Sequence, residues 1–489
     1  MSAAAASSVS SASAAPSTPR RRDYDALFAR GKDGAGCPAL FLAPMEGLGD
    51  SRLRKALFRS SGGFDEACRE FTRVPGSLSQ GAKPERFLRS IALNGYDAHE
   101  LGRKKSEGGD ECDASYFPPA PSLLAAQLMG STPELLERCA RFLAEEGGAP
   151  RVDLNCGCPA NVVTGKGAGS SLLRNPYDVE ACVAAVRRGV AGTGAAVSLK
   201  MRSGFDDRGL LRENLLAAQA GGAEFVTLHA RTRAQGYSGR AQWADIALAV
   251  EILDIPVVGN GDVTSPGRAA ELVLETGCAG LMVGRGAVQD PLLFRRIAAA
   301  LGGPDGGAQY RRSVSAMASR RGEPELGGGS REGSHHGYTV NGGGLGTEWW
   351  ELSREEEAKE VVLFLRRFAA EVFTASDEPA AGKQRRRVRP EAAENFQLGK
   401  LKQVCKYLFA SNQSLAAHIT RVLGTTLADG TPQGLLDDVE DLVMRQWGVP
   451  EDVLVDAFSM RTSYADGVAA DEKRGRLATR GVGKDIVRL

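Results

Sequence analysis

Eight short apolar segments alternate with helix-length segments between about residues 38 and 300, with Gly, Asn, Asp and Pro at the turns. The predicted strands are 39–45, 66–71, 123–130, 151–157, 196–202, 225–231, 255–259 and 280–285. Helices are predicted between most of them, including Pro133 to Glu146 and Asn175 to Val190. A doubly wound open sheet would alternate too, but no GxGxxG opens a first helix. The pattern therefore predicts an α/β fold, a (β/α)8 TIM barrel over residues 38–301.

The segments that flank the barrel pattern differ from it in composition. Residues 1–37 begin with a Ser-, Ala- and Pro-rich stretch, which predicts a disordered tail or an organelle transit peptide. The location is therefore expected to be cytoplasmic, or organellar if residues 1–22 act as a transit peptide. Residues 302–350 have the composition of a low-complexity linker. Residues 351–450 are helical in period and predict a C-terminal helical domain, followed by a tail at 451–489.

Composition limits the classes of protein that this chain can belong to. No run of 18 apolar residues occurs, so no membrane-spanning helix is expected. The nine cysteines include no CxxC pair and the five histidines no HExxH pattern, so we expect no metal site. The net charge is only +1, but basic residues gather at 383–389 and at Lys400, Lys402 and Lys406. From charge alone, these runs fit a solvated linker as well as an RNA contact.

The ends of the predicted strands carry the polar residues that suit a ligand site. In a TIM barrel the ligand binds at the carboxyl ends of the strands. Glycine turns follow the last two strands, and they predict a phosphate site made by Asn260, Gly261, Asp262, Gly284 and Arg285. The amide of Gln127 suits the pyrimidine edge of a flavin, and Lys200 suits the flavin N1/C2 region. Pro44 and Met45 end the first strand, where the backbone can pass close to a flat ligand.

The segment around Cys158 predicts a thiol at the mouth of the barrel. Asp153, Leu154 and Asn155 continue a strand that Gly157 and Pro159 end abruptly. Cysteines at strand ends are also often inert core residues, so the thiol alone does not settle its role. Strand alternation turns Cys156 away from the pocket.

Seven motifs, in order along the chain, resemble the tRNA-dihydrouridine synthase family. They are Leu42-Ala43-Pro44-Met45, Gln127-Leu128-Met129-Gly130, Asp153 to Pro159, Lys200-Met201-Arg202, His229-Ala230-Arg231-Thr232, Asn260-Gly261-Asp262 and Gly284-Arg285-Gly286. The runs 69–74 and 155–159 look most like the bacterial C-type members. The helices expected at 392–430 are similar to the tRNA-binding domain of the family. Asn161 stands where the family usually has Lys.

The resemblance implies NADPH-dependent reduction of uridine in tRNA to 5,6-dihydrouridine, with FMN as the carrier and Cys158 as the proton donor to C5. The cofactor contacts that it implies are Pro44, Met45, Gln127, Lys200, His229, Asn260, Gly261, Asp262, Gly284 and Arg285. The implied substrate contacts are Asn155, Arg231, Arg385, Arg386 and Arg387. One alternative is an FMN barrel that reduces a small free substrate, as dihydroorotate dehydrogenases do, but a basic helical appendage argues against it. Another is a tRNA-binding protein without catalysis, which the presence of Cys158, Lys200 and Gln127 disfavours.

Overall fold

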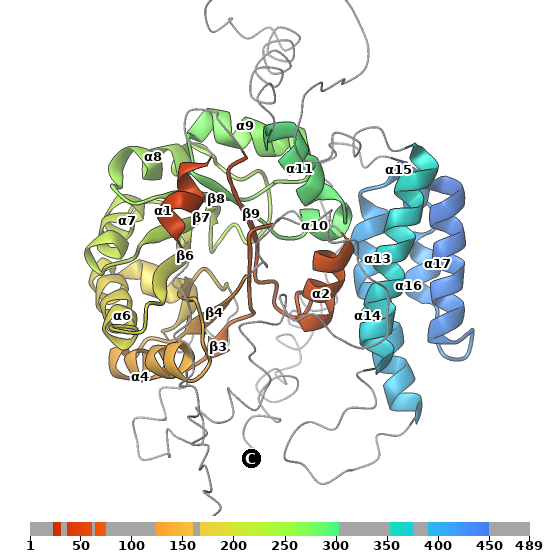
Figure 1. The fold of residues 1–489 in the computed structure, drawn as a ribbon, viewed down its shortest axis with the longest axis horizontal. Helices are drawn as coiled ribbons and strands as arrows, with labels where there is room; N and C mark the ends of the chain where they lie inside the picture. The colour runs from red at the N-terminus through yellow and green to blue at the C-terminus, as the bar shows by residue number, and fades with distance from the viewer. Residues whose placement is uncertain are drawn as a thin grey trace, which may run out of the picture.

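The computed structural model describes residues 23–30, 37–60, 64–74, 123–159, 167–302, 353–374 and 390–448. In Figure 1 a ring of strands is surrounded by helices, and the helices of the C-terminal part stand to one side, next to α2 and α10. The predicted linker at 302–350 and the predicted tail at 451–489 lie almost wholly outside these residues.

The described strands form one closed, wholly parallel barrel. Their bounds are β1 Ala39–Leu42, β2 Glu66–Cys68, β3 Thr72–Arg73, β4 Leu123–Met129, β5 Arg151–Cys156, β6 Ala196–Gly204, β7 Phe225–Thr232, β8 Val257–Asn260 and β9 Gly280–Val283. They pair in the order β2-β1-β9-β8-β7-β6-β5-β4-β3, and a β2–β4 pairing closes the ring. The TIM-barrel prediction is confirmed. Eight positions hold nine strands because β2 and β3 share one position beside β4.

The predicted strand 66–71 is therefore wrong in detail. Arg69 still donates its backbone N–H to the Ala125 carbonyl, but Glu70 leaves the ladder and its carboxylate accepts from Arg54 Nη1 at 2.7 Å. The chain rejoins β4 only at Thr72.

Helices cover the outside of the barrel in the intervals between the strands (Figure 1). Around the barrel they are α2 Ser51–Ser60, α4 Pro133–Glu145, the 3-10 helix η4 Gly169–Arg174, α6 Pro176–Gly189, α7 Leu211–Ala220, α8 Ala244–Ile252, α9 Pro266–Thr276, α10 Gly286–Gln289 and α11 Leu293–Gly302. The two helices predicted at 133–146 and 175–190 are confirmed, each to within one residue at either end.

Strand alternation divides β5 between two environments. Val152, Leu154 and Cys156 are fully buried in the core between the sheet and its helices. Arg151 and Asp153 point into the barrel, where they bond to one another. The sequence RVDLNC thus places its polar residues on the inner face, as a period of two requires.

A short helix before the first strand fills the floor of the barrel, which the sequence did not predict. Residues 1–37 were expected to be a tail, but α1 spans Tyr24–Ala29, with Asp23 Oδ1 accepting from the Ala26 N–H at 2.9 Å as a helix cap. The rings of Tyr24 and Phe28 lie 5.4 and 5.1 Å from that of Phe225 on β7. An N-cap Asp and apolar residues at positions 24, 27 and 28 were the available signal.

The C-terminal part is helical, as predicted. Its helices are α13 Arg354–Thr374, α14 Pro390–Ala410, α15 Gln413–Ala416, α16 Ile419–Gly424 and α17 Pro432–Gln446. The helices expected at 392–430 are α14, α15 and α16, and α15 is separate from α14 because Asn412 caps its start.

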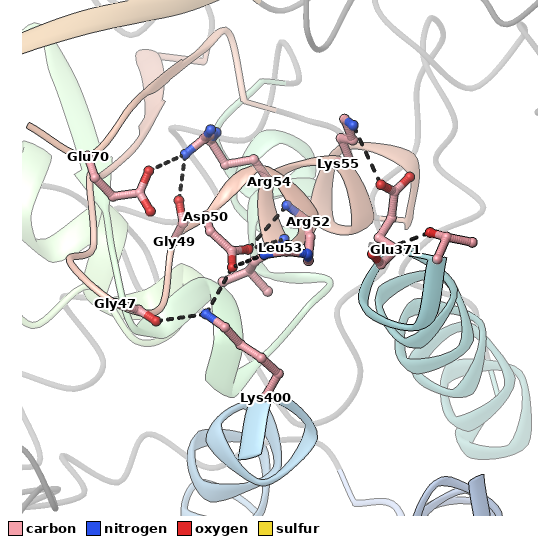
Figure 2. Close-up of polar contacts among 11 residues, drawn as sticks. Gly47, Gly49, Asp50, Arg52, Leu53, Arg54, Lys55, Glu70, Glu371 and Lys400 are labelled. Atoms are coloured by element: carbon pink, nitrogen blue, oxygen red, sulfur yellow. Dashed lines mark hydrogen bonds and ion pairs between the residues drawn. The ribbon is translucent and has the colours of Figure 1, made fainter. Parts of the chain in front are cut away.

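Ion pairs join these helices to the barrel (Figure 2). We call this set of ion pairs the seam. Glu371 on α13 pairs with Lys55 and Arg59 on α2, at 3.5 and 2.8 Å. Lys400 Nζ on α14 lies 2.9 Å from Asp50 Oδ2 and donates to the Gly47 carbonyl at 3.1 Å. The loop between β1 and α2 is therefore attached to the helical part.

The described C-terminal helices are less basic than the runs of Lys and Arg in the sequence suggested. Within 353–374 and 390–448 there are nine Lys or Arg residues and twelve Asp or Glu residues. Arg366, Arg421 and Arg445 each pair with an acid of α17. The basic run 383–389, with Arg385, Arg386 and Arg387, lies outside the described residues.

Candidate active site

A chain of buried hydrogen bonds runs up the inside of the barrel, and we call its members, Glu66, Arg151, Asp153, Gln127 and Asn155, the polar column. Arg151 Nε donates to Glu66 at 2.8 Å, and Arg151 Nη1 to Asp153 at 3.1 Å. Gln127 Nε2 then donates to Asp153 at 2.7 Å, and its Oε1 accepts from Asn155 Nδ2 at 2.8 Å. Burial raises the pKa of Asp153, with Arg151 opposing that effect. Arg151 binds both carboxylates, and the amides of Gln127 and Asn155 continue the hydrogen-bonded chain to the mouth of the barrel.

Asn155 ends the column and holds the turn that carries Cys158. Its Oδ1 accepts from the backbone N–H groups of both Gly157 and Cys158, each at 2.9 Å. Asn155, expected to contact substrate, thus has its oxygen occupied within the protein. One Nδ2 hydrogen goes to Gln127, and the amide has a second.

Cys158 lies at the mouth with 7% of its surface exposed. It packs against Met129, Ala168 and Phe71, and its carbonyl accepts from Ser170 Oγ at 2.9 Å. Its Sγ is 3.9 Å from Glu46 Oε2. Cys156, two residues earlier on β5, is fully buried on the helix-facing side of the sheet, and burial raises its pKa well above the usual range.

Lys200 on β6 faces the end of β8. Its Nζ donates to Asn260 Oδ1 at 3.2 Å, and Asn260 Nδ2 donates to the Met282 carbonyl at 2.7 Å. Burial lowers the pKa of Lys200 to about 8, with Arg202 adding to the effect. Since a nearby anion would reverse that shift, this ammonium suits an anionic partner.

His229 and Arg231 end β7 beside the glycine turn after β8. Arg231 Nη1 lies 3.3 Å from His229 Nε2, and because arginine only donates, that nitrogen accepts. Burial, with Arg202, Lys200 and Arg231 adding to it, holds the pKa of His229 well below its usual range, so the ring is neutral. Gly261 has φ +123°, and a Cβ there would meet Ala241 at 2.8 Å, which explains the glycine.

Asp262 serves the loop after β7. It accepts from Arg231 Nη2 at 2.7 and 2.9 Å and from the Ala241 N–H at 2.7 Å. A carboxylate carries the same sign of charge as a phosphate. These contacts therefore suit Asp262 to holding Arg231 and the loop, and they occupy Arg231, expected to contact substrate, with protein partners.

The sequence indicated no role for Arg202, although it lies two residues after Lys200 and therefore on the same face of β6. It is 2% exposed, and Nε donates to the Gly157 carbonyl at 2.9 Å. Nη1 donates to the carbonyls of Thr232 and Gly236 at 3.0 and 2.6 Å. Arg202 thus ties the Cys158 turn to the loop after β7.

The remaining predicted cofactor residues lie around the same mouth. Arg285 places its guanidinium 4.4 Å from the centre of the Tyr237 ring. A Cβ on Gly284 would stand 3.5 Å from Ala43 and 3.8 Å from Met45 Sδ, so this turn faces the end of β1, where Pro44 and Met45 lie. Asn161 falls outside the described residues. Within the part that the structure describes, no cluster of His, Cys, Asp or Glu suits a metal ion.

The parallel barrel, with a thiol and gathered cations at the carboxyl ends of its strands, defines a TIM-barrel enzyme. The family model described as dihydrouridine synthase matches residues 106–321. A tRNA-dihydrouridine(16) synthase of Cupriavidus necator is 40% identical over 259 residues, 53% of this chain and 73% of the relative. One from Ralstonia nicotianae is 38% identical over 259 residues, 53% and 72% of the two chains.

The chain therefore belongs to the dihydrouridine synthase family, a family of flavin-dependent oxidoreductases. This confirms the family expected from the seven motifs. Among the described helices, none has both the length and the apolar character needed to cross a bilayer.

Proposed function

We propose that this chain reduces a uridine of tRNA to 5,6-dihydrouridine, with bound FMN as the carrier and NADPH as the reductant. The observation that carries the proposal is the placement of Cys158, fixed through Asn155 at the mouth beside the cations of β6 and β7. Both relatives described above are named for position 16, and we extend that position to this chain as part of the proposal.

The residues present fit a phosphate-bearing flavin. Lys200, Arg202, Arg231 and Arg285 gather at the carboxyl ends of β6, β7 and β9. Asp262 offsets Arg231, which leaves this side of the mouth positive and suited to an anion. Gly261, Gly284 and Arg285 would hold the phosphate, Lys200 the N1/C2 region, and Gln127, Met45 and His229 the ring. When bound, the flavin supplies the hydride that reaches C6 of uracil.

Cys158 acts on the opposite side of the reaction. A thiol has an ordinary pKa of about 8.5 and is protonated near neutral pH, so it can donate the proton that C5 requires. The S–H bond breaks and the C5–H bond forms, and the thiolate then recovers its proton from water. Asn155 contributes by fixing the backbone of Cys158, and its second Nδ2 hydrogen can reach an acceptor on the base.

The tRNA must present its base to this pocket by extrusion from the folded RNA. The described helices are not net basic, so we assign the phosphate contacts to the run with Arg385, Arg386 and Arg387, together with Lys402 and Lys406. Lys400 is removed from that set because it pairs with Asp50.

Replacement of Cys158 tests the proposal. Cys158→Ala is expected to bind flavin and to oxidise NADPH as before, but dihydrouridine formation in tRNA should fall about 10²–10⁴-fold, the usual contribution of one general acid. Dihydrouridine would be counted and located by mass spectrometry of tRNA fragments, and the flavin released on denaturation identified as FMN or FAD.

Cys156→Ala is the matched control, because that thiol lies two residues away on the helix-facing side of β5. It is expected to retain most of the activity. Full activity in Cys158→Ala would exclude the thiol as the acid, and reduction of free uridine in place of tRNA would favour a small-substrate reductase.

A further inference from the structure

Cys158 has both a carboxylate and a guanidinium among its neighbours. Glu46, in the loop after β1, stands 3.9 Å away and is exposed to solvent. Arg202 binds the Gly157 carbonyl, and its guanidinium interacts electrostatically with Cys158. The thiol is therefore near a negative charge from the loop after β1 and a positive charge from strand β6.

The cations alone would work against the proposed chemistry. A neighbouring Arg favours the thiolate, and a thiolate has no proton to give. Among the described residues, Glu46 interacts electrostatically with Arg73 and Glu70, and Arg202 interacts with Cys158, Tyr237, Arg231 and Arg285. Glu70 is paired with Arg54 at 2.7 Å, and among the carboxylates of the described residues it is Glu46 that accepts from the sulfur, at 3.9 Å.

We propose that Glu46 is a positioning residue that keeps Cys158 in its thiol form. Its carboxylate accepts the S–H, and its negative charge disfavours a second negative charge on the sulfur. The inference rests on the proposed function, in which Cys158 supplies a proton.

The protonation of Glu46 agrees in sign with this role. Although Glu46 is exposed as a residue, partial burial of its carboxyl group raises its pKa. Arg73 lowers the pKa, Glu70 raises it, and the hydrogen bond from Cys158 lowers it. Glu46 therefore loses its charge at a higher pH than usual when the solution is acidified. Glu46 loses its charge at acidic pH, where the thiol of Cys158 stays protonated without Glu46. At alkaline pH, where the thiolate would otherwise form, the carboxylate of Glu46 is charged.

The loop that carries Glu46 is held from both sides (Figure 2). Lys400 on α14 binds the Gly47 carbonyl, and Arg54 on α2 donates to the Gly49 carbonyl at 2.6 Å. These contacts fix the backbone directly after Glu46, so the carboxylate has a defined place at the mouth.

The test measures Cys158 itself, apart from turnover. The flavin-loaded protein would be alkylated with iodoacetamide from about pH 6 to 10, and modification of Cys158 followed by fragment mass spectrometry, because only the thiolate reacts. Glu46→Gln is expected to move the midpoint of reactivity down by about one pH unit, since an exposed carboxylate acts at the low end of the usual range for a neighbouring charge. Glu46→Asp, which keeps the charge, should give a smaller shift.

Asp206→Asn is the matched control, because Asp206 is an exposed acid in the loop after β6, where it pairs with Arg174. Its midpoint should equal that of the unchanged protein. The alkaline limb of tRNA turnover should move with the alkylation midpoint in Glu46→Gln.

An unchanged or raised midpoint in Glu46→Gln overturns the inference, as does an equal shift in Asp206→Asn. If Cys158→Ala still formed dihydrouridine while the midpoint shifted as expected, the proposed function would fail and the electrostatic pairing would stand. If Cys158 proved essential but its midpoint did not respond to Glu46, only this inference would fail.

Discussion

The polar column and the seam both contain ion pairs, but the paired side chains are buried in the column and partly exposed in the seam. In the column the side chains of Arg151 and Glu66 are 0% exposed. In the seam Lys400 and Asp50 are 17% and 20% exposed, and Arg59 is 40% exposed. A charge that loses its partner in the column has no water to replace it, whereas one in the seam does. The column is therefore a fixed support for Cys158, and the seam is a contact that can be altered with little cost in stability.

The largest effect is expected for Arg151→Met in the column. This change leaves Glu66 and Asp153 buried without their cation, which typically costs about 3–5 kcal/mol when one partner of a buried pair is removed. Urea unfolding at neutral pH measures it.

Arg187→Met is the matched control, because Arg187 pairs with Glu224 at 2.6 Å and is 48% exposed. Its loss should be about 0–1 kcal/mol. Equal losses in the two variants would end the distinction between buried and exposed pairs.

An effect of intermediate size and opposite sign is expected for Lys200→Met above the column, in flavin-free protein. The pKa of Lys200 is lowered to about 8 from 10.5, so its charge costs the fold below pH 8 and that cost disappears above 10.5. The variant should therefore be more stable at neutral pH, by about 3 kcal/mol at most.

This gain should shrink as the pH rises through 8 to 10.5, as measured by urea unfolding at several pH values. Flavin binding should weaken in the same variant. A Lys200→Met protein that is less stable at pH 7 would show that the ammonium already has an adequate partner.

The smallest effect is expected for Lys400→Met in the seam. Asp50 retains Arg52 at 3.0 Å and the Leu53 N–H, so the loss in unfolding free energy should be about 0–1 kcal/mol. Although burial acts to raise it, the pKa of Asp50 is lowered, with Lys400 as the main cause. The contribution of the pair is thus present above the ordinary Asp pKa and is lost as the pH falls through the folded value.

Unfolding from pH 7 down to 3 would show the two proteins converging at the acid end. A loss as large as that of Arg151→Met would place the seam in the same class as the column.

The sequence predicted the barrel because its period of strand and helix is regular, and it predicted Cys158 at the mouth because Gly157 and Pro159 end β5. It assigned Gln127, Asn155 and Asp262 to ligands, whereas the structure gives each of them protein partners as well. Residue type at a strand end predicts that a polar group faces the mouth. It does not predict which neighbour will reach that group first, because this depends on the register of strands distant in sequence.

Arg202 and Glu46 show the same limit. Arg202 bonds to three carbonyls from two loops, and Glu46 meets a sulfur 112 positions away in the chain. Helix α1 was missed for another reason. Its six residues are too few for periodicity to stand out beside a Ser- and Ala-rich stretch.

Helix α1 also moves the practical boundary of the catalytic domain. The hydroxyl of Tyr24 donates to Glu66 Oε2 at 2.6 Å, so the base of the polar column is built partly by residues that precede the first strand. A version shortened to begin at residue 38 would keep every strand that the structure describes, but it would leave Phe41 and Phe225 without Phe28 and open Glu66 to water. Proteolytic trimming or a fusion junction placed between Asp23 and Ala39 would thus act on the support of Cys158 from the opposite end of the barrel.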